Sequence, residues 1–291
     1  MLCDEVRRAC AQIAASAGSV SIDLDALEHV YASPAPPPQL DPVRHYLDGE
    51  PPDVAMYFLT VDSVNFGSGW FPTLRKRAGS SGYFTVAWAI ADRFRAHGPW
   101  TPAELRALRT DEIAETLGQP RDHELMALYA QALRALGVFL GDRDALALVR
   151  AARGSAEALA TRLARGMALF ADRGFYKRAQ IVPANLALAG VARFDDLDRL
   201  TIFADNLVPH VLRCDGVLRY DERLAAHIDA GLLLPAGRAE REIRACAVRA
   251  CELIAQRAGA SEHELDNWLW SRGQAPDYKS VPRHRTRTVY Y

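Results

Sequence analysis

The sequence lacks the short motifs that mark a metal centre or a phosphate-binding loop. It contains no C-x-x-C pair, no H-x-x-x-H pair and no G-x-x-x-x-G-K-[ST] run, so neither a zinc site nor a P-loop is expected. Its five cysteines are odd in number and few for 291 residues, which argues against a disulfide framework. We therefore expect reduced thiols and no metal or other cofactor.

Long apolar runs and an excess of one charge are also missing. No uninterrupted apolar stretch reaches the length of about 18 residues that a membrane span needs, and the opening MLCDEVRRACAQIAAS carries charges where a signal peptide is apolar. We expect a cytoplasmic protein without a membrane partner. The 35 basic and 36 acidic side chains leave a net charge of −1, which argues against a stable nucleic-acid partner and confines any phosphate site to a local region.

Apolar material in a helical pattern is abundant. Hydrophobic residues make up 49% of the chain, enough for a sizeable core, and alternating β-branched stretches are few. We therefore predict an all-α, compact multi-helix fold with few or no strands. Residues 54–66, VAMYFLTVDSVNF, fit either a buried helix or a strand, and we favour the helix.

Several helix starts are visible. Thr101, Pro102 and Glu104 combine an N-cap, a first-position proline and a capping-box glutamate. The sequence predicts further helices from Ser155, over about residues 239–256, and from a capping box at Ser261 and Glu264. The helix from Ser155 is expected to present an apolar stripe of Leu159, Leu163, Met167 and Phe170 to the core.

The chain is expected to contain three segments that form one functional unit. Residues 1–32 read as an N-terminal helical segment. Residues 33–44 read as a proline-rich strap, because proline lacks the backbone donor of a helix and restricts its predecessor. Residues 45–291 show neither an internal repeat nor a convincing linker, so we expect one helical domain there and a monomeric protein.

An aspartate interrupts the apolar run TIFADNLVPH at residues 201–210. A carboxylate in such surroundings loses hydration, and only hydrogen bonds, an opposite charge or a role in chemistry offset that cost. Asp205 is therefore a helix cap, a partner of a neighbouring arginine, or a catalytic carboxylate.

Polar and aromatic residues gather in further segments. In VDSVNFGSGWFP, Asn65 precedes a Gly-Ser-Gly loop that allows a close approach of backbone donors to a ligand, or that is an ordinary turn. In FYKRAQIVPAN, adjacent Lys177 and Arg178 form either a solvated face or an anion site.

The C-terminal region holds two further candidates. On a helix over LDNWLW, Asp266 and Trp270 share a face, which suits a planar base that stacks and donates hydrogen bonds. The basic, aromatic ending VPRHRTRTVYY is either a frayed tail or a docked segment.

Together these segments resemble the queuosine salvage protein family, from about His45 to Tyr291. The matching motifs are DSVNFGSGWFP, SGYFTVA, FYKRAQIVPAN, LTIFADNLVPHVLRCDGVLRY, EIRACAV, LDNWLW and HRTRTVYY. Several long motifs in one order are a stronger signal than any short one.

The resemblance implies a hydrolase that cleaves the N-glycosidic bond of queuosine 5′-monophosphate, with queuosine as a second candidate, and releases queuine and ribose 5-phosphate. It also implies a catalytic domain over residues 45–291, similar to helix-hairpin-helix DNA glycosylases and without a metal. The site residues are expected to be Asp205 and Lys177 at the catalytic centre, with His45, Asn65, Phe203, Asp266, Asn267, Trp270, Ser271, Arg178 and Arg285 binding the substrate. The chain departs from the family pattern where FADNL and His210 stand in place of FADYR and a glutamine, and where Ser271 stands in place of an aspartate.

The expected roles follow from the chemistry. Cleavage of a ribosyl C–N bond builds positive charge on the sugar. Asp205 is expected to stabilise this cation, to trap it as a covalent intermediate, or to activate the water that attacks it. Phe203 stacks on the base, and Asp266 accepts a hydrogen bond from the base edge or pairs with the side-chain ammonium of queuine. Lys177 first, then Arg178 and the C-terminal arginines, are candidates for the 5′-phosphate.

Two other functions are compatible with the sequence. A glycosylase that acts on bases in DNA or RNA would share the expected fold, although the near-neutral charge argues against it. A non-catalytic module that binds queuine or a modified tRNA would show binding without turnover.

Overall fold

The computed structural model describes residues 1–29 and 39–291. Their regular elements are helices apart from two short strands, which confirms the expected all-α class. The α-helices are α1 (Leu2–Ala15), α2 (Leu24–His29), α3 (Pro51–Ser63), α4 (Gly82–His97), α5 (Pro102–Ala107), α6 (Thr110–Thr116), α7 (Glu124–Leu140), α8 (Ala145–Ala151), α9 (Ala156–Gly166), α10 (Lys177–Leu188), α11 (Val208–Cys214), α12 (Glu222–Asp229), α13 (Arg238–Ala258), α14 (Glu262–Arg272) and α15 (Pro276–Ser280). Three 3-10 helices, η1 (Phe71–Thr73), η2 (Ala168–Phe170) and η3 (Leu197–Arg199), and two short strands, β1 (Val20–Ile22) and β2 (Leu218–Tyr220), complete the described elements. None of the helices in this part of the chain is long and apolar enough to cross a membrane. The similarity to helix-hairpin-helix glycosylases stays a prediction.

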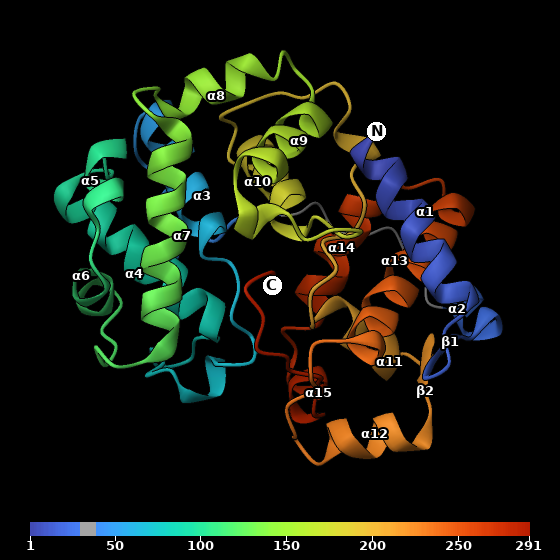
Figure 1. Ribbon diagram of the computed structural model, residues 1–291. Helices are drawn as coiled ribbons and strands as arrows, with labels where there is room; N and C mark the ends of the chain where they lie inside the picture. The colour runs from blue at the N-terminus through green and yellow to red at the C-terminus, as the bar shows by residue number, and fades with distance from the viewer. Residues whose placement is uncertain (30–38) are drawn as a thin grey trace.

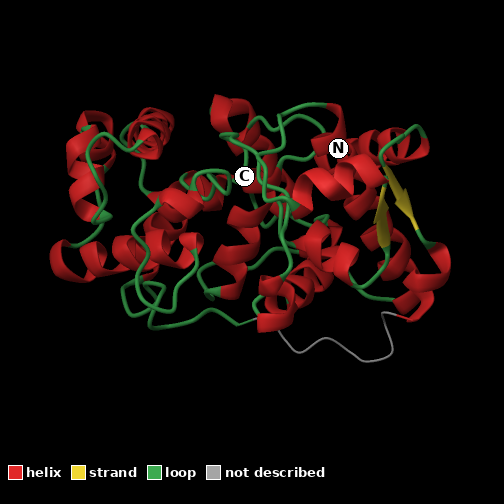
Figure 2. Cartoon of the chain, turned by 90° about the horizontal axis from the view of Figure 1, so that it is seen from below, coloured by secondary structure: helices red, strands yellow, loops and turns green. Residues whose placement is uncertain are grey.

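The helices form two groups with α9 and α10 between them (Figure 1). In one group α3 packs on α4, α7 and α8, while α5 and α6 pack on α7. In the other, α1 lies along α13, and α11 packs on both α13 and α14. The C-terminal segment after α15 runs into the middle of the molecule, as Figures 1 and 2 both show. The aromatic ending is therefore docked between the groups.

The N-terminal segment is attached to the second group. β1 pairs antiparallel with β2, with Val20 opposite Tyr220 and Ile22 opposite Leu218. Of the predicted strap at 33–44, residues 33–38 lie outside the described residues, and residues 39–44 form a loop and a turn.

The predicted capping boxes are confirmed. The Thr101 hydroxyl accepts a hydrogen bond from the Glu104 amide at 3.2 Å, and the Glu104 carboxylate accepts one from the Thr101 amide at 2.7 Å. Ser261 and Glu264 form the same reciprocal pair at the start of α14. These contacts satisfy amides that have no partner within the first helical turn.

The helix from Ser155 is shorter than its apolar stripe predicted. The Ser155 hydroxyl accepts from the Ala158 amide at 3.0 Å, but α9 ends at Gly166, because Met167 adopts extended backbone angles of φ −133° and ψ 119°. Met167 and Phe170 are nevertheless buried in the core. The apolar spacing therefore predicted burial correctly and continuity of the helix wrongly.

The ambiguous stretch at residues 54–66 is helical up to its last three residues. α3 runs from Pro51 to Ser63, and every side chain from Val54 onward is buried. A helix that is apolar on all sides is surrounded by other elements, which explains why no single face was visible in the sequence. The predicted helix over residues 239–256 is likewise confirmed as α13.

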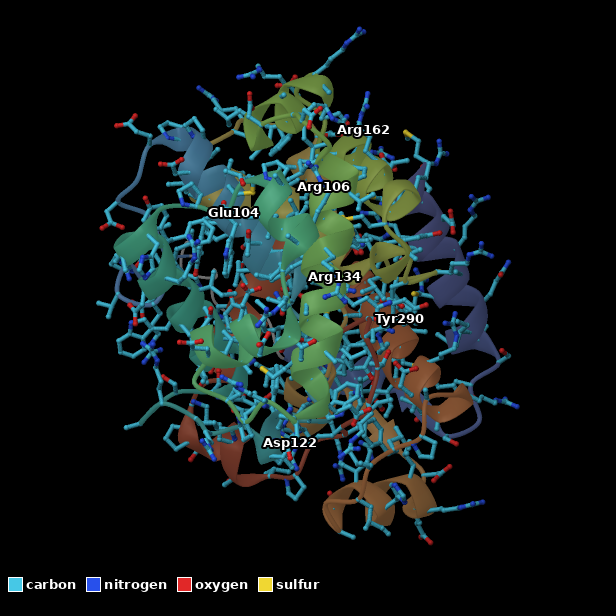
Figure 3. All side chains as sticks on the ribbon, turned by 60° about the vertical axis from the view of Figure 1, so that its left-hand side comes forward. Glu104, Arg106, Asp122, Arg134, Arg162 and Tyr290 are labelled. Carbon is cyan, nitrogen blue, oxygen red and sulfur yellow. The ribbon has the colours of Figure 1, made fainter. Side chains whose placement is uncertain are left out.

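Arginine-to-carbonyl contacts join α5 to α7 on the outer face of the first group, where Figure 3 labels both arginines. Arg106 of α5 donates to the carbonyl of Gly141 at 2.9 Å, and Arg134 of α7 donates to the carbonyl of Leu108 at 2.8 Å. The helices approach closely at Gly137, where an added Cβ would lie 2.7 Å from the carbonyl oxygen of Pro102. A larger residue there would push α5 away from α7.

A buried arginine holds the loop before α11 in place. Arg244 of α13 donates to the carbonyl of Ala204 at 2.9 Å and forms ion pairs with Asp172 and Glu240. The Arg244 side chain is 2% exposed and that of Asp172 is 5% exposed, so neither charge is screened by water. Removing one partner of such a cluster leaves a buried charge with less compensation.

We expect Asp172→Asn to lower the free energy of unfolding by about 3 kcal/mol, because it removes part of the compensation of the buried Arg244 charge. Urea unfolding followed by circular dichroism measures the change. The control is Asp142→Asn, at a fully exposed side chain 3.9 Å from Arg106, where the loss should stay below about 0.5 kcal/mol. Equal losses in the two variants would contradict this account of the core.

Candidate active site

A cavity lies between the two helix groups and encloses about 1270 Å³ of space free of protein atoms, its open mouth included. Its wall comes from residues 39–45, 65–71, 81–84 and 203–207, from one face each of α10 and α14, and from residues 279–283 and Tyr291. Of the predicted site residues, His45, Asn65, Lys177, Phe203, Asp205, Asn267, Trp270 and Ser271 line this cavity. The fold thus gathers residues as far apart in the sequence as His45 and Ser271.

One face of α10 lines the cavity. Lys177, Ile181, Asn185 and Leu188 follow one another at intervals of three or four residues and all contribute to the wall, as residues on one helical face do. Most of the other α10 residues are buried in the core. The helix therefore brings an ammonium and an amide to the cavity while its other faces hold it in place.

Asp205 caps the start of α11 and also faces the cavity. Its Oδ1 accepts hydrogen bonds from the amides of Leu207 at 2.6 Å and Val208 at 3.4 Å. No group in residues 1–29 or 39–291 donates a hydrogen bond to Oδ2, and no arginine of these residues lies within ion-pair distance. Capping therefore accounts for one carboxylate oxygen and leaves the other free to meet a ligand.

The Lys177 ammonium is held among carboxylates. The side chain is buried, and its Nζ donates to both oxygen acceptors of Asn65, at 3.1 Å to the carbonyl and 2.9 Å to Oδ1. Burial lowers the pKa of Lys177, while the charges of Asp205, Asp62 and Asp266 oppose that lowering. The ammonium is therefore placed beside Asp205, with two of its three hydrogens already donated.

Asp266 lies behind the cavity wall and does not belong to it. Its Oδ1 accepts a hydrogen bond from the backbone amide of Phe203 at 2.8 Å, while the Phe203 side chain lines the cavity. Burial, and after it the nearby Asp205 charge, raise the pKa of Asp266 to about 8. Asp266 is thus largely protonated at neutral pH and fixes the backbone of Phe203, the residue that was predicted to stack on the base.

Aromatic rings form one end of the cavity. Trp270 meets the ring of Phe84 edge to face with centroids 5.6 Å apart, and Tyr83 with centroids 6.1 Å apart. His45 is fixed by the carbonyl of Asp41 at 3.0 Å and the hydroxyl of Tyr83 at 3.2 Å, and burial lowers its pKa. A neutral imidazole beside apolar rings suits a flat, uncharged heterocycle.

The polar residues of α14 lie at the same end. Asn267 donates from Nδ2 to the carbonyl of His263 at 2.9 Å, which turns its Oδ1 away from that bond, and Ser271 follows one turn later. At the other departure from the family pattern, His210 donates from Nε2 to the carbonyl of Tyr278 at 2.8 Å and does not line the cavity. Leu207 lines the wall where the resemblance leads us to expect an arginine.

Two predicted phosphate ligands lie outside the cavity wall. Arg178 is 1% exposed and donates to the carbonyls of Ser63, Leu169 and Val289 between two phenylalanine rings. Arg285 is held by its backbone, whose carbonyl accepts from the amide of Leu234 at 2.9 Å. Arg178 does not line the cavity, because backbone acceptors of other segments, which the sequence does not reveal, engage two of its guanidinium nitrogens.

Sequence reasoning missed Asn185, Lys279 and Arg283, all of which line the cavity. In the run P-R-H-R-T-R, arginines alternate with His284 and a threonine, and in extended backbone alternate side chains point to opposite sides. The buried position of His284 confirms this alternation. Which arginine reaches the cavity depends on how the segment docks, so the spacing alone could not select Arg283 over Arg285.

A resident metal has no evident place in the described part of the chain. No group of three or more histidine, cysteine, aspartate or glutamate side chains is placed there to hold an ion. The groups that the cavity offers for chemistry include the carboxylate of Asp205, the ammonium of Lys177 and the aromatic rings of its wall.

Comparison with known proteins identifies relatives of this chain. Residues 45–291 match the family described as "Queuosine salvage protein". A protein of Sphaerobacter thermophilus named "Queuosine 5'-phosphate N-glycosylase/hydrolase" is 33% identical over 96% of this chain and 95% of its own length. Proteins of the same name from Dictyostelium discoideum and Mus musculus are 38% and 36% identical, each over 40% of this chain and 40% of their own length.

The raised pKa of Asp266 predicts how stability depends on pH. Between the ordinary value of 3.8 and about 8, the folded protein keeps a proton that the unfolded chain releases, so stability falls as pH rises. Asp266→Asn removes this loss while its amide oxygen still accepts from Phe203. Urea unfolding at pH 5 and pH 7.5 should show the variant gaining relative to the wild type, by at most about 1.4 kcal/mol per pH unit. A pH-independent difference would contradict the raised pKa.

Proposed function

The chain belongs to the queuosine salvage protein family, and from this premise we propose that it hydrolyses the N-glycosidic bond of queuosine 5′-monophosphate. The products are queuine and ribose 5-phosphate. The observation that carries the proposal is Asp205, which lines a cavity with aromatic and cationic residues in its wall and whose Oδ2 accepts no hydrogen bond from the described residues. The net charge of −1 supports a free nucleotide as substrate rather than a nucleic acid, and we propose that a monomer acts in the cytoplasm.

Asp205 is proposed to stabilise the positive charge that develops on the ribose. As the bond between C1′ and the base nitrogen lengthens, the sugar approaches an oxocarbenium ion, and a carboxylate close to C1′ lowers the energy of that state. Water adds to C1′, and the departing base takes up a proton. The capped Oδ1 orients the carboxylate, so little reorganisation is needed while the charge develops.

The aromatic end of the cavity is proposed to hold the base. Phe203, whose backbone is fixed by Asp266, supplies a ring face, and Trp270 closes the same end. Asn267 and Ser271 offer polar groups for the edge of the base or its side chain. In this arrangement Asp266 acts through Phe203 and not by direct contact with the base.

The 5′-phosphate is proposed to bind Arg283 and Lys279. Both line the cavity, and in the described residues no hydrogen bond or ion pair engages the Arg283 guanidinium. Burial and the neighbouring Arg285 lower the pKa of Arg283, so a phosphate dianion would relieve an unfavourable arrangement of like charges. Lys177 is less suited, because Asn65 already accepts two of its hydrogens.

Asp205→Asn should lower kcat for queuosine 5′-monophosphate by about 10³-fold or more, while binding of queuine persists. The amide keeps the shape of the carboxylate but cannot stabilise the sugar cation. Chromatographic detection of free queuine measures turnover, and calorimetry measures binding. The exposed Asp142→Asn variant should behave like the wild type. Binding without turnover in the wild type itself would instead support a non-catalytic module.

Arg283→Met should raise KM for queuosine 5′-monophosphate by about 10- to 100-fold, the equivalent of one lost charge-assisted hydrogen bond. The same variant should leave the KM for the nucleoside queuosine almost unchanged, because the nucleoside has no phosphate. Arg285→Met is the matched control in the same segment. A larger effect of Arg285→Met than of Arg283→Met would restore the assignment that the sequence suggested.

A further inference from the structure

A wholly buried aspartate lies behind the α10 face of the cavity. Asp62 is 0% exposed, near the end of α3, a helix whose other buried residues are mostly apolar. Both of its carboxylate oxygens accept hydrogen bonds from Nδ2 of Asn185, each at 3.0 Å. Nδ2 of Asn65 donates to Oδ1 at 3.5 Å. A carboxylate in a core position is costly unless it is hydrogen-bonded, and these two amides provide the bonds.

The two asparagines connect Asp62 to the cavity. Asn65 and Asn185 both line it, while Asp62 does not. An amide side chain has donors on one side and an acceptor on the other, whereas an ionised carboxylate only accepts. Asp62 therefore selects the orientation in which Asn65 turns Nδ2 inward and presents Oδ1 to the Lys177 ammonium, 2.9 Å away.

We propose that Asp62 is a positioning residue for glycosidic-bond cleavage, which through Asn65 holds the Lys177 ammonium beside the Asp205 carboxylate and through Asn185 sets the polar group next to it. This inference depends on the proposed function, since it assigns a task to the same site. Asp62 contacts neither the cavity nor a substrate, so its effect is transmitted by the two amides.

The electrostatics of the cluster are consistent with this role. Burial raises the pKa of Asp62 to about 6, while Asn185, Lys177, Asn65 and Arg178 act to lower it. The charged groups that face Lys177 are Asp205, Asp62, Arg178 and Asp266. Removing the negative charge of Asp62 should lower the pKa of Lys177, because Asp62 is one of the groups that keep it protonated.

A merely structural role makes a different prediction. If Asp62 only ties α3 to α10, its replacement should reduce stability and leave the rate and pH profile of the folded enzyme unchanged. Glu157 is the matched control, because it is also a buried carboxylate with hydrogen-bonded partners, the Cys3 amide at 2.9 Å and Arg199 at 3.2 Å, yet it does not line the cavity.

The test compares kcat and kcat/KM as functions of pH for wild type, Asp62→Asn, Asn65→Ala, the double variant and Glu157→Gln. Asp62→Asn should lower kcat by about 10- to 100-fold, the effect of a small displacement of a catalytic group, with a smaller change in KM. It should also move the basic limb of kcat/KM to lower pH. Asn65→Ala should lower kcat similarly, and the double variant should be no slower than the slower single variant, because the two residues act in one chain. Asn65→Ala keeps the test available if Asp62→Asn does not fold.

A wild-type kcat and an unshifted pH profile in Asp62→Asn, as expected for Glu157→Gln, would overturn the proposal. A wild type that does not cleave the nucleotide would refute the proposed function instead. The coupling of Asp62 to Lys177 through Asn65 is then decided by the urea midpoints of Asp62→Asn, Lys177→Met and their double variant. Non-additive shifts would support this coupling, and additive shifts would refute it.

Discussion

The proposed site depends on the contacts of one buried side chain, the guanidinium of Arg244. It forms ion pairs with Asp172 and Glu240 and donates to the carbonyl of Ala204, one residue before the proposed catalytic carboxylate. Its guanidinium carbon also lies 4.4 Å from the ring centroid of Tyr291. One side chain on α13 thus contacts both the loop that carries Asp205 and the C-terminal segment that carries Arg283, and both segments contribute to the cavity wall.

Around the cavity, three carboxyl groups are made different by their surroundings. Asp205 lines the cavity and has one oxygen held by backbone amides, while no group in the described residues donates a hydrogen bond to the other. Asp266 is buried and has a raised pKa, so it can accept from the Phe203 amide without adding a second negative charge near Asp205. Asp62 is buried more deeply still and bonded by two amides. The charges of Asp205 and Asp62 act on Lys177 and help to offset the burial of its ammonium.

The cations of the region are likewise divided between structure and ligand. Arg244 and Arg178 are engaged by carboxylates, carbonyls and rings of the protein itself. Arg283 lines the cavity without such partners in the described residues. A cation that lines a cavity without a hydrogen-bonded partner is a feature expected of an anion subsite, and this separates Arg283 from Arg244 and Arg178.

From the amino-acid sequence alone we could predict the helical class, the capping boxes at Thr101 and Ser261, and the segments that meet in the cavity. These features depend on the local spacing of apolar residues, on backbone chemistry and on family motifs that occur in a fixed order along the chain. It also singled out Asp205, whose apolar neighbours make a carboxylate conspicuous. Only the tertiary structure decided which groups remain free. Arg178 and Asp266 have residue types suited to ligand binding, but carbonyls of other segments engage the first, and the Phe203 amide engages the second. Asp62 shows the converse. Its link to Lys177 passes through Asn65, which accepts from the ammonium 112 residues along the chain, and its other partner, Asn185, is 123 residues away. Hydrogen-bond saturation is a property of what surrounds a group in space, and no local pattern in the chain encodes it.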